Sequence, residues 1–152
     1  MMSCDTNVLF AAVNPDDANH AIACEFLNDH ANDSNFVLAE QVLVELYALL
    51  RNPTIQRKPL SAKEAVAVVG SFRRNPSWAI VDVPSDPSVM GEVWHMAARQ
   101  NFARRRIHDV RLGMTLKYWN VDEFYTRNVR DFGDIGFQRL ADPFANKGKK
   151  RT

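Results

Sequence analysis

The chain has 152 residues, which is enough for one domain with a sizeable hydrophobic core. Hydrophobic residues make up 46% and charged residues 24%, a composition that excludes extensive disorder and fibrous or low-complexity sequence. The 19 basic and 18 acidic side chains give a formal net charge of +1, so the overall charge does not indicate a nucleic-acid-binding protein.

Three features of the sequence bear on where the protein works. No apolar run approaches the length of a membrane-spanning helix, so none is expected. The first ten residues have no basic region ahead of their apolar stretch, so we expect no secretory signal and a cytoplasmic location. Cys4 and Cys24 are too few for a disulfide framework, and both are expected to be reduced and buried.

The first third of the chain predicts strands and helices in alternation. Residues 3–5 are expected to form a short strand that leads through a turn into a helical segment over residues 8–12. The pair Asn14-Pro15 predicts the start of a helix that runs to about residue 31, because Asn is a good N-cap and Pro fits the first helical position. Residues 36–39 predict a buried strand, and residues 40–51 predict a helix with an apolar stripe.

The remaining two thirds of the chain continue this alternation. Ser61 and Glu64 form a capping box, in which each side chain is expected to accept from the backbone N–H of the other, and this predicts a helix start. The following elements are expected in order: a strand over 78–83, a helix from about 85, a helix over about 108–119, and strands over 121–126 and 137–140. The side chains expected to face the core from these helices are Val68, Val69, Phe72, Met90, Val93, Trp94, Ala97, Ala98, Leu112, Thr115, Leu116 and Trp119.

Short apolar strands that alternate with helices are typical of the α/β class, in which helices cover both faces of a parallel sheet. In such sheets, ligands bind beyond the carboxyl ends of the strands. Candidate functional residues are therefore sought where a predicted strand ends.

Three acidic residues, far apart in the chain, stand out. Asp5 follows the first strand, although it could instead serve only to cap the next helix. Glu45 is the only charged residue between Glu40 and Arg51, and a carboxylate among apolar neighbours needs a partner unless it points to solvent. Asp109 lies in the first turn of a predicted helix, where the helix dipole alone would favour it.

A further polar group follows the strand predicted over 121–126. It contains Thr126, Asn128 and Asp131, with Asp134 close behind, and a turn or a helix cap could also explain it. If the sheet brings the acids together, carboxylates about 4 Å apart repel by about 4 kcal/mol per pair at a surface-like dielectric constant. Such a cluster favours bound Mg²⁺ or Mn²⁺, and the chemistry that it implies is phosphodiester hydrolysis.

The order and spacing of these motifs resemble the PIN domain. The resemblance rests on Asp5-Thr6-Asn7-Val8-Leu9, on Glu45 in the helix after the second strand, on Asp109 in a later helix, and on residues 126–132 after the next strand. Residues 106–112 and 141–144 are also similar to VapC-type toxins of bacterial toxin–antitoxin pairs. The resemblance covers residues 1–144, expected to be one PIN domain, and leaves 145–152 as a basic, flexible tail.

This resemblance implies a three-layer α/β/α fold with a mostly parallel central sheet, and a Mg²⁺-dependent endoribonuclease that could also use Mn²⁺. It assigns Asp5, Glu45 and Asp109 as catalytic metal ligands. Asn128 stands where many PIN domains have Asp, so Asp131 is expected to be the fourth catalytic acid, with Asn128 as a further ligand. The side chains expected to hold the carboxylates or a water molecule are Thr6, Asn7 and Thr126.

The resemblance also implies partners: an RNA substrate (tRNA, rRNA or mRNA), a cognate antitoxin protein, and a second copy of the chain in a homodimer. Candidate phosphate contacts are Arg104, Arg105, Arg106 and Lys117, although ordinary solvated charge explains them equally well. The alternative function is a non-catalytic PIN-like module that binds RNA or protein, which the Asn at position 128 leaves open. A haloacid-dehalogenase-like phosphatase is disfavoured, because Asn7 stands where that chemistry needs a second acid.

Overall fold

The structure, a computed structural model, describes residues 1–145. The tail predicted over 145–152 therefore lies, apart from Ala145, outside the described residues. From the N-terminus the elements are β1 (Met2–Cys4), α1 (Thr6–Val13), α2 (His20–Asp29), β2 (Val37–Ala39), α3 (Glu40–Leu50), α4 (Ala62–Arg73), β3 (Ala79–Val81), α5 (Pro87–Ala97), α6 (Arg106–Tyr118), β4 (Glu123–Tyr125), the 3₁₀ helix η1 (Val129–Phe132) and β5 (Arg139–Ala141).

The strands form a parallel arrangement, as the sequence predicted. Strand β2 pairs with β3, while β1, β4 and β5 pair in that order, and each of these pairings is parallel. A single parallel bridge between Met2 and Phe36 connects the two groups. The resulting order is β3-β2-β1-β4-β5, so the chain crosses over once, between β3 and β4. Each strand has three residues, which is shorter than the predicted ranges over 78–83 and 121–126.

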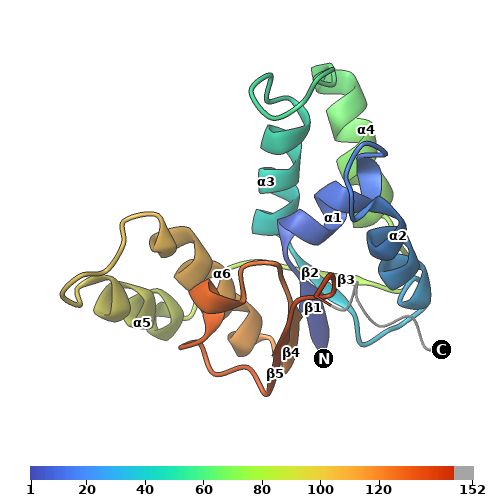
Figure 1. The fold of residues 1–152 in the computed structure, drawn as a ribbon. Helices are drawn as coiled ribbons and strands as arrows, with labels where there is room; N and C mark the ends of the chain where they lie inside the picture. The colour runs from blue at the N-terminus through green and yellow to red at the C-terminus, as the bar shows by residue number, and fades with distance from the viewer. Residues whose placement is uncertain (146–152) are drawn as a thin grey trace.

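The crossover separates the helices into two layers. Helices α1 to α4 lie on one side of the sheet, and α5 and α6 lie on the other, as Figure 1 shows. This division follows from right-handed connections between parallel strands, because the chain moves outward from β1 to β3 and then returns past β1 to β4. Three layers result, in agreement with the predicted α/β/α class.

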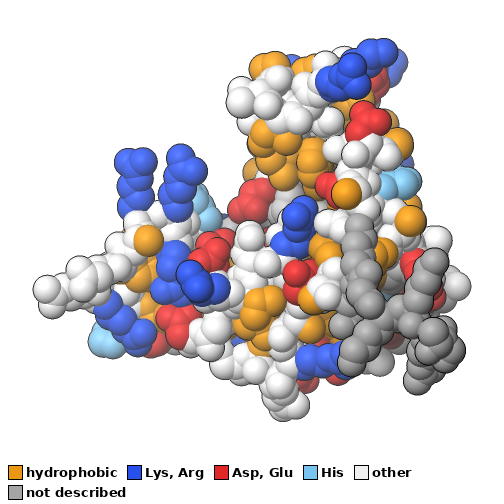
Figure 2. Space-filling model, in the orientation of Figure 1, with side chains coloured by type: hydrophobic (Ala, Val, Ile, Leu, Met, Phe, Trp, Pro, Cys, Tyr) orange, Lys and Arg blue, Asp and Glu red, His pale blue; other side chains and the backbone are white. Residues whose placement is uncertain are grey.

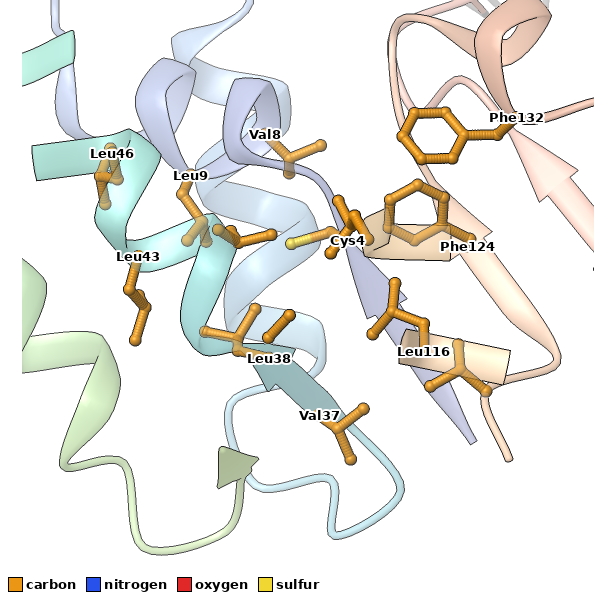
Figure 3. Packing of buried hydrophobic residues seen from close by; sticks show 14 of the residues in the cluster. Cys4, Val8, Leu9, Val37, Leu38, Leu43, Leu46, Leu116, Phe124 and Phe132 are labelled. Atoms are coloured by element: carbon orange, nitrogen blue, oxygen red, sulfur yellow. The ribbon is translucent and has the colours of Figure 1, made fainter. Parts of the chain in front are cut away.

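The core fills both sides of the sheet. Cys4, Leu38 and Phe124 come from the strands and are completely buried, and helices on either side cover them (Figure 3). The ring of Phe124 lies edge-on to that of Phe132 at 4.8 Å between centroids, which fixes η1 against β4. Cys4 is free and buried as predicted, whereas Cys24 is free but only partly buried.

The predicted start of the second helix at Asn14 is wrong. Asn14 instead ends α1 in an extended conformation, and the next helix begins at His20. Side chains between the two helices bond to nearby backbone: Asn14 Oδ1 accepts from the N–H of Asp16 at 3.2 Å, and Asp17 Oδ1 from that of Asn19 at 2.7 Å. Such local bonds stabilise turns, so they compete with a helix cap at the same residues.

Two tryptophans predicted to face the core are exposed. Trp94 is 60% exposed, because α5 buries Val89, Val93 and Met96, and a residue next to Val93 points about 100° away from that stripe. Ala98 is also exposed. Trp119 follows the end of α6, is 39% exposed, and donates its indole N–H to the carbonyl of Asp82 at 2.8 Å.

The predicted start of α4 is confirmed in part. Oγ of Ser61 accepts from the backbone N–H of Glu64 at 3.2 Å, which is the Ser half of the capping box. The helix predicted over about 108–119 begins two residues earlier, at Arg106, and the last strand lies at Arg139–Ala141 rather than 137–140. Across residues 1–145, the helices are all too short or too polar to span a membrane.

Candidate active site

Asp5 lies where β1 ends and α1 begins. Its backbone N–H donates to the carbonyl of Tyr125 at 2.9 Å, which extends the β1–β4 pairing by one residue. Its Oδ1 accepts from the backbone N–H of Thr6 at 2.7 Å, so the side chain does cap α1. Only 6% of Asp5 is exposed. Helix capping therefore accounts for one carboxylate oxygen and leaves the other for contacts with β4.

The second oxygen of Asp5 is held by side chains that the sequence singled out. Oδ2 accepts from Oγ1 of Thr126 at 2.7 Å and from Nδ2 of Asn7 at 3.3 Å. Thr126 in turn accepts from Asn7 and from the backbone N–H of Asn128, at 3.3 and 3.0 Å. Asp5 is therefore fixed by groups from the ends of both β1 and β4.

Glu45 faces Asp5 from α3. Its Oε2 accepts from Oγ1 of Thr6 at 3.0 Å, and its Oε1 accepts from Nε2 of Gln41 at 3.1 Å. Thr6 consequently bonds to both acids, to Asp5 through its backbone and to Glu45 through its hydroxyl. Glu45 is partly buried, so the alternative of a carboxylate pointing freely to solvent does not hold.

Asp109 and Asp131 approach the same place from α6 and η1. Asp109 lies in the first turn of α6 and is half-buried. Nη2 of Arg106 donates to the carbonyl of Asp131 at 3.0 Å and to Oδ1 of Asp134 at 2.7 Å. These two bonds hold η1 against the start of α6, so Asp131 is positioned relative to Asp109.

The charges of the neighbouring acids act on Asp5 and on Asp109. Burial raises the pKa of Asp5 to about 6, against hydrogen bonds from Thr126 and Thr6 that lower it. The charges of Glu45 and Asp131 contribute to this raised pKa of Asp5. Burial likewise raises the pKa of Asp109 to about 6. The charges of the other three acids add to this rise in the pKa of Asp109, and the nearby Arg106 opposes it.

The four side chains supply only oxygen ligands, and their charges repel, which are the properties of a site for a hard divalent cation. Figure 2 shows acidic side chains in the recess between the α3–α4 pair and the α5–α6 pair. Within residues 1–145, however, no three His, Cys, Asp or Glu side chains are arranged so that they could hold a metal ion as they stand. The donor chemistry of the four acids therefore fits a divalent cation.

The basic residues chosen from the sequence lie in different settings. Arg104 and Arg105 are exposed at the start of α6 and form no ion pair with another described residue. Arg106 was expected to contact phosphate, but it is committed to Asp134 and Asp131. Lys117 is near the other end of α6, about 12 Å along the helix from Asp109, with its Nζ 5.9 Å from the Phe137 ring centroid.

Asn128 contributes through its backbone. Its side chain is exposed, and its N–H donates to Thr126, which holds Asp5. Asp131 is the residue of this segment whose charge acts on Asp5 and Asp109. The structure thus brings Asp131 into the acid cluster, and Asn128 beside it.

Two residues at the site were given no role from the sequence. Gln41 bonds to Glu45 and to the carbonyl of His108, and Arg111 bonds to Gln41. The only available signal was that Gln41 precedes Glu45 by four positions, which places both on one face of a helix.

Comparison with known proteins identifies the family. Comparison with models of protein families gives no match. The chain is 46% identical over 148 residues to Ribonuclease VapC24 of Mycobacterium tuberculosis, in strains H37Rv and CDC 1551, which covers 97% of this chain and all of the relative. This chain belongs to the VapC family of ribonucleases.

Solved structures agree with the VapC fold. VapC20 of Mycobacterium tuberculosis, a toxin that cleaves the sarcin–ricin loop, superposes with a TM-score of 0.66 at 18% identity, over 90% of this chain and 96% of VapC20. VapBC2 of Rickettsia felis, bound to promoter DNA, gives 0.64 at 16% identity over 93% and 97%. FitAB bound to the IR36 DNA fragment gives 0.61 at 17% identity over 94% and 95%. The chain thus has the fold of these structures, and its membership of the VapC ribonuclease family disfavours the alternative of a non-catalytic module.

Proposed function

We propose that this VapC ribonuclease is a metal-dependent endonuclease, with Mg²⁺ or Mn²⁺ as its cofactor. The observation that carries the proposal is the meeting of Asp5, Glu45, Asp109 and Asp131 from four separate elements, with the pKa values of Asp5 and Asp109 raised to about 6. Because ionised carboxylates oppose one another there, a divalent cation is the ligand that the site favours most.

Asp5, Glu45 and Asp109 would hold the cation, with Asp131 as the fourth acid and Asn128 beside it. A bound divalent cation supplies a polarised phosphodiester, an activated water and charge neutralisation at the leaving oxygen. The protein's own groups do the positioning. Thr126 and Asn7 fix Asp5, and Thr6 sets the separation between Asp5 and Glu45.

The substrate is RNA, and we propose that it is cut internally. The exposed Arg104 and Arg105 lie at the start of α6, whose first turn carries Asp109, and they can attract the phosphate backbone there. We place the activity in the cytoplasm, where tRNA, rRNA and mRNA are all available as substrates.

We also propose a cognate antitoxin and a homodimer. Two similar structures are named as the pairs VapBC2 and FitAB, which supports a partner that regulates this chain. The side chains of Val44, Val66 and Trp94 are 63%, 60% and 60% exposed. A second copy of the chain would cover such exposed apolar side chains. Light scattering of the purified protein tests the dimer, and a mass equal to one chain at all concentrations would reject it.

The metal requirement is tested with purified protein and defined RNA species. Cleavage of tRNA, rRNA and mRNA should stop in EDTA and return when Mg²⁺ or Mn²⁺ is added in excess. Labelling the substrate at either end shows whether each label appears in a fragment longer than one nucleotide, as internal cleavage requires. Full activity in EDTA would overturn the metal proposal.

A pair of variants tests the site itself. Asp5→Asn should abolish cleavage, because it removes one negative charge from the cluster and keeps the size of the side chain. Asp16→Asn is the matched control, since Asp16 is exposed in the loop after α1 and bonds through its backbone to Asn14. Equal activity of Asp5→Asn and Asp16→Asn would reject the assignment of Asp5.

A further inference from the structure

The carboxylate of Glu45 is held from two sides. Thr6 of α1 donates to Oε2 at 3.0 Å, and Gln41 donates to Oε1 at 3.1 Å. Gln41 lies one helical turn before Glu45 on α3, so the two side chains share a face of that helix. Both carboxylate oxygens are therefore engaged, and the orientation of Glu45 depends on how firmly Gln41 is fixed.

Gln41 is fixed by three hydrogen bonds. Besides Glu45, its Nε2 donates to the carbonyl of His108 at 2.9 Å, and its Oε1 accepts from Nη1 of Arg111 at 2.7 Å. The orientation of the amide is unambiguous, because Arg111 can only donate, whereas a carbonyl and an ionised carboxylate can only accept. A reversed amide would lose all three bonds.

These bonds join the two helices that carry Glu45 and Asp109. Arg111 and His108 belong to α6, and His108 precedes Asp109 directly. The Gln41 side chain thus contacts both the carboxylate of Glu45 and the backbone carbonyl of His108, the residue before Asp109. The side chains of Gln41, Glu45, His108 and Arg111 line one open groove of about 530 Å³, so these side chains are accessible to solvent.

We propose that Gln41, anchored by Arg111, is a positioning residue that orients Glu45 toward the cation and sets the spacing between Glu45 and Asp109. The proposal rests on the proposed metal-dependent function. Gln41 acts through Glu45 and touches neither substrate nor cation. Partners of metal ligands typically change metal affinity or activity by about 10–100-fold when they are removed.

A merely structural role for Gln41 makes a different prediction. If its bonds only attach α3 to α6, their loss lowers the melting temperature and leaves cation affinity unchanged. If they orient Glu45, their loss weakens cation binding, and a high cation concentration restores turnover. The two roles are therefore separated by a binding measurement that does not depend on cleavage.

The test uses Gln41→Leu, which keeps much of the side-chain volume and removes all three bonds. Calorimetric titration with Mn²⁺ should show Kd raised by about 10–100-fold. With RNA as substrate, kcat at limiting Mg²⁺ should fall by a similar factor, KM for RNA should stay unchanged, and saturating Mg²⁺ should restore kcat. Unchanged Mn²⁺ affinity in Gln41→Leu would overturn the proposal, whatever happens to the melting temperature.

Arg111→Met tests the anchor, because it removes the donor to Gln41 and keeps the aliphatic stem. It should weaken Mn²⁺ binding less than Gln41→Leu does, and the double variant should match Gln41→Leu within about twofold, since both act through one amide. Independent, multiplicative effects of the two substitutions would overturn the role of Arg111.

Arg73→Ala is the matched control. Arg73 joins α4 to Glu40 of α3 through an exposed ion pair of 3.1 Å, and it does not contact Glu45. It should leave Mn²⁺ affinity unchanged, and a loss equal to that of Gln41→Leu would overturn the proposal. Wild-type protein that binds no divalent cation overturns this proposal and the proposed function together, whereas equal tight binding by wild type and Gln41→Leu overturns this one alone.

Discussion

Oγ1 of Thr126 lies 2.7 Å from Oδ2 of Asp5, although 121 positions separate the two residues in the chain. Their strands are adjacent and parallel, with Cys4 paired with Tyr125, so Asp5 and Thr126 each follow a paired residue at the same edge of the sheet. The contact therefore follows from the topology. The residue directly after β1 is therefore adjacent to the residue directly after β4, and polar side chains at these two positions can form a hydrogen bond.

This arrangement gives Asp5 an unusual balance of forces. Its carboxylate is almost buried and accepts from Thr6, Asn7 and Thr126, yet its pKa is still raised to about 6. Burial and the neighbouring acids therefore outweigh three favourable hydrogen bonds. In the metal-free protein, ionisation of Asp5 lowers the stability of the fold. A bound cation compensates the negative charges and removes this destabilisation, so metal binding and stability are linked.

Asp109→Asn should make the metal-free protein more stable at pH 7.5. The wild-type carboxylate is ionised there against a raised pKa, and the amide removes that opposition while keeping the shape of the side chain. After allowance for its half-buried position and for solvent screening, we expect a gain on the order of 1 kcal/mol in the free energy of unfolding. Urea denaturation in EDTA measures this gain.

The same variant should lose function. We expect Asp109→Asn to show no metal-dependent cleavage and no rise in melting temperature when Mn²⁺ is added, whereas the wild type shows both. The pH dependence provides the control. The stability difference between variant and wild type should vanish below about pH 3, where Asp109 is protonated in the folded and the unfolded chain, and should grow up to about pH 6. A difference that does not change with pH would contradict the charge explanation.

Metal affinity should depend steeply on pH. Asp5 and Asp109 both have pKa values of about 6, so below that pH a cation must displace a proton from each. The apparent affinity for Mn²⁺ should then rise by up to about 100-fold per pH unit below 6 and level off above 7. Calorimetry in two buffers of different ionisation enthalpy counts the protons released. Release of no protons at pH 5.5 would contradict the raised pKa values.

The acids could be found from the sequence because their positions follow a simple rule. Asp5 and the segment after Thr126 come directly after strands, and parallel strands bring such positions to one edge. Glu45 stood out because it is a lone charge in an apolar stretch. The layers and the parallel sheet were predictable for the same reason, since strand and helix alternate regularly along the chain.

The polar contacts between helices could not be found in this way. Gln41 and Arg111 are partly exposed polar residues, and such residues follow no periodic pattern that would predict a partner on another helix. The role of Arg106 was missed because a run of three arginines indicates a solvated basic patch, while only the packed structure shows Asp134 beside one of them. The turn at Asn14 was missed because a capping side chain and a turn-forming side chain use the same acceptor atom.

The three arginines are therefore expected to behave differently. Arg104→Ala and Arg105→Ala should each raise KM for RNA and leave kcat unchanged, because both side chains are exposed beside the site. Each should also lower the salt dependence of RNA binding by about one unit in the slope of log K against log salt. Binding measured over a range of salt concentrations tests this.

Arg106→Ala should instead lower kcat and shift the pH profile of cleavage upward. Arg106 holds the carbonyl of Asp131, and its charge lowers the pKa of Asp109, so its loss leaves Asp109 harder to ionise. The melting temperature should fall as well, because the 2.7 Å ion pair with Asp134 is lost. If all three variants changed only KM, Arg106 would be an ordinary phosphate contact, and the positioning role assigned to it would be wrong.

Two glycines in helices should respond to alanine in opposite ways. In α6, a Cβ on the buried Gly113 would lie 2.8 Å from Cγ1 of Ile135 and 2.9 Å from its Cγ2, so Gly113→Ala should cost about 1–3 kcal/mol in the free energy of unfolding. In α5, a Cβ on Gly91 would meet no atom within 4 Å, so Gly91→Ala should stabilise the protein by about 0.5–1 kcal/mol through helix propensity. Because Ile135 follows the segment that carries Asp131 and Asp134, Gly113→Ala should also weaken Mn²⁺ binding, which Gly91→Ala should leave unchanged. Thermal unfolding and calorimetry of both variants measure these effects, and stabilisation by both substitutions would show that Ile135 can move aside without cost.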